Sequence, residues 1–133
     1  MKINFDQKIL TLEGKSIPIL LGDGRKSGKD MTLLSATQEV FTQGTKDDRD
    51  MLPDEKLKRF ELILRITHEV ELDLDSDEIS LIKKLIGNFY VSPVIVGQTL
   101  KMLEGKPTGI VPTKEEQKET EVMERNKKDF GNK

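Results

Sequence analysis

The sequence predicts an α+β protein in which an N-terminal β-hairpin or small antiparallel sheet packs on a bundle of about four helices. Two patterns support this prediction. Apolar and polar residues alternate over short stretches of residues 1–32, as in strands, whereas over 33–105 apolar residues recur at helical spacing. Beyond residue 105 breakers and charged residues dominate. We therefore predict a single α+β domain over 1–105 and a charged, flexible or marginally helical tail over 106–133.

The N-terminal strands are predicted from this alternation. Residues 3–5 and 10–12 each place two apolar side chains on one face, and a glycine-containing turn follows. Residues 16–21 form the next extended run. Because Pro18 has no backbone N–H, this run should be an edge strand or should pair with its neighbour on the side that does not need this N–H. We expect residues 22–30 to be a polar, glycine-rich loop.

Two helices are predicted in the middle of the chain. The first carries an apolar face from Leu33 onward and ends at Gly44, after which a charged loop follows. Residues 31–33 begin either this helix or a short strand. The second begins at Pro53, where a missing N–H costs nothing in a first turn, and ends near Glu69. We expect Phe60 to be a core residue that faces Ile82 of the next helix. The apolar stripe of the second helix comprises Leu57, Phe60, Ile63, Leu64 and Thr67.

Two further helices complete the predicted bundle. Asp75 and Glu78 form a capping pair at the start of the third helix, which should end at Gly87. Ser92 and Pro93 begin the fourth helix as its cap and first-turn proline. The residues predicted to face the core are Ile79, Ile82, Leu85 and Ile86 in the third helix and Val96, Leu100 and Leu103 in the fourth.

Composition narrows the function classes. The chain has no cysteine, which excludes disulfides and thiolate metal sites. Its net charge is −2 and it has few aromatic residues, so nucleic-acid binding, which favours a basic surface with aromatic side chains, is disfavoured. Apolar runs such as 17–21 are too short to span a bilayer, and residues 1–5 lack the apolar run of a secretory signal. We expect a cytoplasmic protein without membrane contact.

The segment 22–30 partly matches a phosphate-binding loop, since it follows an apolar run and contains Lys29 after a glycine. That motif requires four residues between its glycines and a hydroxyl residue after the lysine. Five residues separate Gly22 from Gly28, and Asp30 stands in place of the hydroxyl residue. A carboxylate there would repel a triphosphate. A flexible hairpin loop is the better interpretation, and no cofactor is predicted.

Two further motifs have structural explanations. Residues 73–77 begin like a calcium loop, but Glu78 replaces the required glycine and Lys84 the final acid, so an acidic helix start explains them better. The only histidine, His68, lies near the end of the second helix, where a partly charged imidazole would interact favourably with the negative end of the helix dipole. We predict no metal site and no catalytic residue, and expect that the chain is not an enzyme.

Two features of the predicted helices allow more than one interpretation. A cluster of basic residues would form one patch if the second and third helices lay side by side, although a solvated helix surface is the simpler interpretation. It comprises Lys56, Lys58, Arg59, Lys83 and Lys84. Gly97 lies inside the fourth helix, where glycine costs about 0.5–1 kcal/mol relative to alanine. Close helix crossing or the approach of a partner would explain it.

Seven short blocks between residues 2 and 105 carry a resemblance to a known group of proteins. They are Lys2–Phe5, Leu12–Ile17, Met31–Leu33, Glu55–Phe60, Leu81–Gly87, Val96–Gln98 and Leu103–Glu104. In their order these blocks resemble small proteins of tailed bacteriophages and prophages that have no established activity. The resemblance implies a phage origin and transfers no functional residue.

We expect the protein to bind a protein of host or phage origin, as a phage accessory protein that inhibits or redirects a host system such as transcription or defence. A virion assembly role and a nucleic-acid-binding regulator are the alternatives. The candidate partner-binding residues are Arg25, Lys26 and Lys29 in the loop and Val122 and Met123 in the tail. Both segments combine charge with expected mobility, and a segment that orders on binding can cover a large surface.

Overall fold

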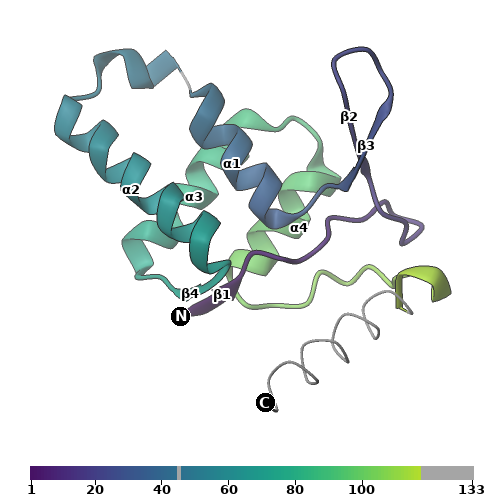
Figure 1. The fold of residues 1–133 in the computed structure, drawn as a ribbon. Coiled ribbons are helices and arrows are strands. Elements are labelled where there is room, and N and C mark those ends of the chain that lie inside the picture. The colour runs from purple at the N-terminus through teal and green to yellow at the C-terminus, as the bar shows by residue number, and fades with distance from the viewer. Residues whose placement is uncertain (45, 118–133) are drawn as a thin grey trace, which may run out of the picture.

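The computed structural model describes residues 1–44 and 46–117 (Figure 1). Within these ranges the chain forms four α-helices, one 3-10 helix and two two-stranded antiparallel sheets, which confirms the predicted α+β class. No helix in these ranges has both the length and the apolar character needed to cross a membrane. The elements are β1 (Lys2–Asn4), β2 (Pro18–Leu20), β3 (Lys26–Asp30), α1 (Leu33–Gln43), η1 (Lys46–Asp50), α2 (Pro53–Glu69), β4 (Glu71–Asp73), α3 (Ser76–Phe89) and α4 (Pro93–Leu103).

The α-helices pack in a row, with α2 on α1, α1 on α3, and α3 on α4. The N-terminal segment adds apolar side chains to the same core, so one hydrophobic cluster joins the helices to the strands β1 and β4. Its largest fully buried members are Ile3, Phe5, Ile9, Leu33, Val40, Ile66, Leu74, Ile82, Ile86 and Leu103.

Strands β1 and β4 form a sheet that the sequence prediction missed. Ile3 of β1 lies opposite Leu72 of β4, and both side chains are buried. The chain passes from α2 into β4 through Val70, whose φ of 58° is in the left-handed region and is uncommon for a β-branched residue. The Val70 carbonyl accepts a hydrogen bond of 2.9 Å from the Phe5 N–H, which holds this turn against the N-terminal segment.

Strands β2 and β3 form a hairpin, so the predicted glycine-rich loop is wrong in its second half. Pro18 lies opposite Asp30 and Leu20 opposite Lys26, with a shift of register between the two pairs. Gly28, with a φ of +84°, adopts a conformation within β3 that other residues rarely adopt. Since this sheet has only two strands, Pro18 lies in an edge strand, as predicted.

Most helix starts were predicted correctly. The Asp75 carboxylate accepts a hydrogen bond of 2.7 Å from the Glu78 N–H, and the Glu78 carboxylate accepts one of 3.1 Å from the Asp75 N–H. Ser92 caps α4, and Pro53 and Pro93 occupy first-turn positions in α2 and α4. Capping residues and first-turn prolines act on the backbone within a few residues, and in the structure they begin the helices at the positions that the sequence indicates.

The predicted core face of α2 is wrong. Phe60 is 56% exposed and Leu57 is 53% exposed, whereas Leu62 and Ile66 are the buried residues of this helix. At helical spacing Leu57, Phe60 and Leu64 lie on nearly the opposite side of α2 from Leu62 and Ile66, and the packing of α2 on the core buries only the latter two. Ile82 of α3 is fully buried, as predicted, but no buried Phe60 faces it.

Three details of α3 and α4 also differ from expectation. Gly87 does not end α3, which continues through two more residues. In α4, Leu103 is buried as predicted, but Val96 and Leu100 are only half-buried. A Cβ atom added at Gly97 would meet nothing within 4 Å, so this glycine does not allow a close helix crossing. The other buried residues of α4 are Gln98, Thr99 and Met102.

Gln98 joins α4 to the N-terminal segment. Its side-chain amide pairs with the main chain of Leu10 as a second peptide group would. The Nε2 group donates to the Leu10 carbonyl at 2.7 Å, and Oε1 accepts from the Leu10 N–H at 2.9 Å. Nε2 also donates to the Val94 carbonyl at 3.0 Å. Gln98 is 4% exposed and Leu10 is 8% exposed, so these hydrogen bonds are formed inside the protein.

The first part of the predicted tail lies against the N-terminal segment. Gly14 is buried there, and its carbonyl accepts a hydrogen bond of 3.1 Å from the Thr113 N–H. A Cβ atom added at Gly14 would lie 2.1 Å from the Val111 carbonyl oxygen, and the φ of +86° also requires glycine. Residues 106–117 are therefore in contact with the rest of the domain.

Glu116 strengthens this contact. Its carboxylate accepts hydrogen bonds from Lys8 Nζ at 3.0 Å and from the Ser16 N–H at 3.2 Å. Burial raises the pKa of Glu116, but these hydrogen bonds and the charge of Lys8 outweigh it, so the net pKa is below the ordinary value. The predicted partner-binding residues Val122 and Met123 lie outside the described residues, and the domain boundary at 105 stays a prediction.

Candidate functional site

The predicted cations Arg25, Lys26 and Lys29 lie together on the β2–β3 hairpin, which projects beyond the helices (Figure 1). All three are exposed. Arg25 is held by Asp23, whose carboxylate accepts a hydrogen bond of 2.6 Å from the arginine Nε. In the described part of the chain, no ion pair involves Lys26 or Lys29. The hairpin therefore presents two uncompensated cations and one that is paired.

Two leucines on the same hairpin are also exposed. Leu20 is 58% exposed and Leu21 is 48% exposed, and the core cluster of the described residues contains no member of 18–30. The hairpin is thus attached to the fold at its base, and residues 18–30 contribute no apolar side chain to the core. We call the exposed group the hairpin surface. It comprises Leu20, Leu21, Arg25, Lys26 and Lys29.

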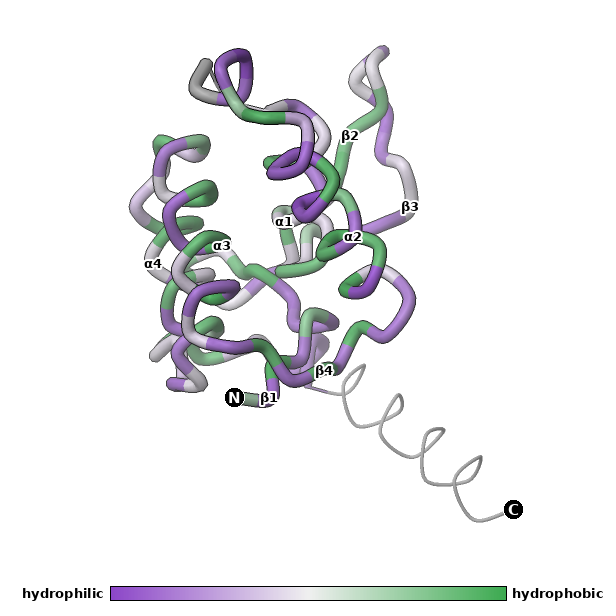
Figure 2. Tube along the Cα trace, turned by 90° about the vertical axis from the view of Figure 1, so that its left-hand side faces the viewer, coloured by the Kyte–Doolittle hydropathy of each residue, from purple (hydrophilic) through white to green (hydrophobic). Residues whose placement is uncertain are grey.

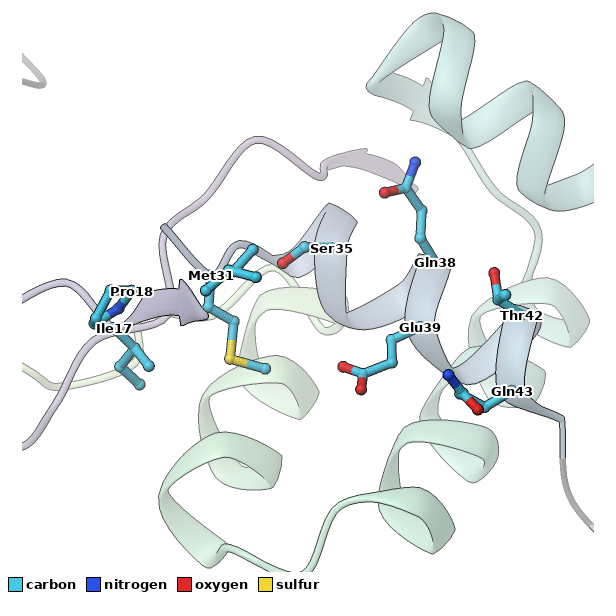
Figure 3. A pocket seen from close by; sticks show the side chains of 9 residues that line it. Ile17, Pro18, Met31, Ser35, Gln38, Glu39, Thr42 and Gln43 are labelled. Atoms are coloured by element: carbon cyan, nitrogen blue, oxygen red, sulfur yellow. The ribbon is translucent and has the colours of Figure 1, made fainter. Parts of the chain in front are cut away.

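A pocket of about 410 Å³ lies at the base of the hairpin beside α1 (Figure 3). Its two walls differ in chemistry. The hairpin side contributes the apolar residues Ile17, Pro18, Ile19 and Met31. The α1 side contributes the polar residues Ser35, Gln38, Glu39, Thr42 and Gln43. A side chain with an apolar stem and a polar end could be accommodated between these walls.

Among the described residues, Glu39 is the only charged one that lines this pocket, and Tyr90 positions it. The Tyr90 hydroxyl donates a hydrogen bond of 2.6 Å to the Glu39 carboxylate. Burial raises the pKa of Tyr90, and the hydrogen bond to the anionic Glu39 raises it further. The phenol is therefore a permanent donor near neutral pH. It links the polar wall of α1 to the C-terminus of α3, which sequence reasoning did not detect.

A second exposed surface lies on α2. Leu57, Phe60 and Leu64 are 53%, 56% and 39% exposed, and we call them the α2 stripe. Figure 2 views the molecule from the side on which α2 lies and shows hydrophobic and hydrophilic stretches alternating along this helix. Phe60 also borders a groove of about 460 Å³ between α1 and α2, together with Phe41 of α1. Exposed large apolar groups in one row mark an interaction surface more often than isolated ones do.

The predicted basic patch on α2 and α3 is not a free positive surface. Arg59 pairs with Asp48 at 3.0 Å. Lys83 pairs with Glu104 at 2.9 Å. Hydrogen bonds from Lys83 and Lys106 to the Glu104 carboxylate, together with the charges of both lysines, lower the pKa of Glu104. Ion pairs thus neutralise part of this cluster, in agreement with its interpretation as a solvated helix surface.

The motifs considered for ligand binding form other structures. The glycine-rich segment folds into the hairpin and leads into β3, whereas a phosphate-binding loop would lead directly into a helix. Asp75 caps α3, and His68 is exposed in the last turn of α2. Over residues 1–44 and 46–117, no three carboxylate or imidazole side chains lie close enough to hold a metal ion.

Comparisons with protein-family models, with curated proteins and with solved structures found no match to this chain.

Proposed function

We propose that the protein acts by binding a protein partner through the hairpin surface, and that the partner presents an acidic patch. One observation carries this proposal: an exposed hairpin outside the core combines two large apolar side chains with three cations. A hairpin needed only to connect β1 to α1 would not require either feature. Exposed connections held by a rigid scaffold are common positions for binding residues.

The two kinds of side chain would have different roles in such an interface. Leu20 and Leu21 would lose water contact against the partner and supply affinity, as apolar anchors at the centre of interfaces do. Lys26 and Lys29 would speed association with an acidic surface and fix its orientation. The adjacent pocket beside Glu39 gives room for one side chain of the partner.

In this proposal the protein is a phage accessory protein that inhibits or redirects a host system, such as transcription or a defence complex. The resemblance of its short sequence blocks to phage proteins supports the origin. An assembly role in the virion uses the same surface with a phage protein as partner. The identity of the captured protein separates these two roles, because host enzyme subunits indicate inhibition and capsid or tail proteins indicate assembly.

A charge-reversal experiment tests the proposal. The chain with Arg25→Glu, Lys26→Glu and Lys29→Glu is compared with the intact chain for capture of partners from infected or host cells. The matched control carries Lys15→Glu, Lys84→Glu and Lys101→Glu, which change the net charge equally at exposed positions elsewhere. We expect the hairpin variant alone to lose the partner, with a nearly unchanged melting temperature because exposed charges contribute little to stability. Equal capture by all three chains contradicts the proposal.

Nucleic-acid binding is a second candidate, favoured by the two uncompensated lysines on a two-stranded ribbon that could enter a major groove. The leucines distinguish the two candidates. Phosphate contacts require the cations but not Leu20 and Leu21, so replacing both leucines by serine would leave DNA retention intact and would abolish capture of a protein. Loss of retention as salt rises, with no effect of the serine changes, would favour nucleic acid.

A further inference from the structure

The polar wall of the pocket at the base of the hairpin has a negative charge that no cation balances. Ser35, Glu39 and Gln43 are spaced four residues apart along α1, so they share one face of the helix. In the part of the chain that the structure describes, no ion pair involves Glu39. The Tyr90 hydroxyl bonds to one carboxylate oxygen, Oε2, and a carboxylate has about four acceptor sites. Glu39 can therefore accept further donors from a ligand in the pocket.

An apolar wall faces this row of polar side chains. Ile17 and Met31 line the pocket from the hairpin side, and both pack against the hydrophobic core, which fixes their positions. In Figure 3 the side chains of Ile17, Met31 and Glu39 extend in the same direction. A ligand whose apolar part lies on Ile17 and Met31 can therefore place a polar end at Glu39.

We propose that this pocket binds the side chain of an arginine of the protein partner. The aliphatic stem lies on Ile17 and Met31, and the guanidinium group lies at Glu39 and Gln43. Charge complementarity carries the choice, because the one charged group in the described pocket lining is a carboxylate and favours a cation. The inference rests on the proposed function for the source of the arginine, which the partner presents beside its acidic patch.

The arrangement of acceptors favours a guanidinium group over the ammonium group of lysine. Glu39 and the side-chain amide of Gln43 lie about one helical turn apart, and a planar guanidinium group with five N–H donors can bond to both. An ammonium group is a compact, more strongly hydrated charge, so it loses more hydration beside an apolar wall. The 2.6 Å hydrogen bond from Tyr90 holds the Glu39 carboxylate in place, which reduces the entropy lost on binding.

Nuclear magnetic resonance of the intact chain with N-acetyl-arginine amide as the probe tests the pocket. We expect saturable shifts of the Met31 methyl signal and of the Glu39 and Gln43 amide signals at roughly millimolar probe, because one side chain buries little area. N-acetyl-citrulline amide is the matched control, since it has nearly the same shape without the charge, and should bind several-fold more weakly at equal ionic strength. N-acetyl-lysine amide should also bind more weakly. No shift at roughly tenfold higher arginine probe, or equal binding of the citrulline or the lysine probe, overturns the proposal.

Two variants test the roles of Glu39 and Tyr90. Glu39→Gln should weaken binding of the arginine probe about threefold to tenfold, as expected for a partly exposed charged hydrogen bond. Glu61→Gln is its control, because it removes the same charge from an exposed position on α2 and should bind like the intact chain. Tyr90→Phe should weaken binding by a smaller factor, since the carboxylate remains but is no longer held. Unchanged binding by Glu39→Gln overturns the proposal, and unchanged binding by Tyr90→Phe overturns the positioning role of Tyr90. The amide spectrum shows whether each variant is folded, and the comparison of probes on the intact chain needs no variant.

The inference and the proposed function can fail separately. Binding of the arginine probe requires no partner, whereas the capture experiment reverses the cations of the hairpin surface and leaves the pocket intact. The Glu39→Gln chain joins the two tests, because it should capture the partner about threefold to tenfold less well than the Glu61→Gln chain. If Glu39→Gln captures the partner as well as the intact chain does, no arginine of that partner occupies the pocket. That result overturns this inference and leaves the proposed function standing.

Discussion

Replacing Gln98 by leucine should destabilise the fold strongly, because leucine keeps the size of the side chain but removes its hydrogen bonds. The Leu10 N–H and carbonyl both use the Gln98 amide, at 2.9 and 2.7 Å, and both residues are buried. A buried main-chain group left without a partner costs about 1–3 kcal/mol. Two such groups, offset in part by the apolar contacts of leucine, give an expected loss of about 2–5 kcal/mol.

Urea unfolding followed by far-ultraviolet circular dichroism measures this loss as a change in the extrapolated free energy of unfolding. Gln43→Leu is the control, since Gln43 is exposed in the last turn of α1, and it should change stability by less than about 0.5 kcal/mol. A loss at Gln98 below about 1 kcal/mol with an unchanged urea dependence would refute the reasoning, because Leu10 would then have found other partners.

Three further outcomes follow from the packing. Ile82→Ala should cost about 2–5 kcal/mol and Phe60→Ala less than about 1 kcal/mol, measured by urea unfolding of dilute protein, and similar losses would show that α2 is rotated. Gly14→Ala should lower the melting temperature, because its Cβ would collide with the 106–117 segment, whereas Gly97→Ala should raise it through helix propensity; the reverse order contradicts this packing. Glu116→Gln should destabilise the protein near neutral pH. Because the pKa of Glu116 is lowered in the folded state, the ionised carboxylate stabilises the fold above about pH 4.5, and this stabilisation is lost as the pH falls through the folded pKa. The free energies of unfolding of the two chains should therefore converge in acid. A difference between them that stays constant with pH would contradict this.

The sequence predicted those parts of the fold that depend on near neighbours. The Asp75 cap, the prolines that begin α2 and α4 and the edge position of Pro18 each follow from groups within a few residues. The α+β class follows from the change of hydrophobic period near residue 32. In these cases the local chemistry permits only a few backbone conformations, and tertiary packing does not alter the choice.

The wrong or missing predictions concern features that depend on contacts between segments distant in sequence. The sequence of α2 offers two apolar faces, and only the position of α1 selects Leu62 and Ile66 over Phe60. Strand β4 is three residues long and forms because β1 lies beside it. Gln98 looks like a surface residue until Leu10 is placed opposite its amide. No periodicity in one segment contains this information.

In the candidate site, too, some features follow from the local sequence and others depend on contacts between distant segments. The exposed cations of the hairpin were predicted from their glycine-rich, polar setting, which excludes a core position. The exposure of Leu20 and the contact between Tyr90 and Glu39 were not predicted, since the first depends on where β2 lies relative to α1 and the second joins two helices. The α2 stripe was mistaken for core because exposed and buried apolar faces have the same helical spacing.

Site-specific photo-cross-linking in host cells tests the central claim most directly. The chain carries a benzophenone amino acid at Leu20 in the hairpin surface, which is 58% exposed, or at Val91, which is 96% exposed and distant in sequence from the hairpin. We predict that Leu20 cross-links to one dominant protein, that Val91 does not, and that Lys26→Glu with Lys29→Glu removes the product. A cross-link that survives the reversal of both lysines, or a partner captured from Val91 and not from Leu20, would contradict the assignment of partner binding to the hairpin.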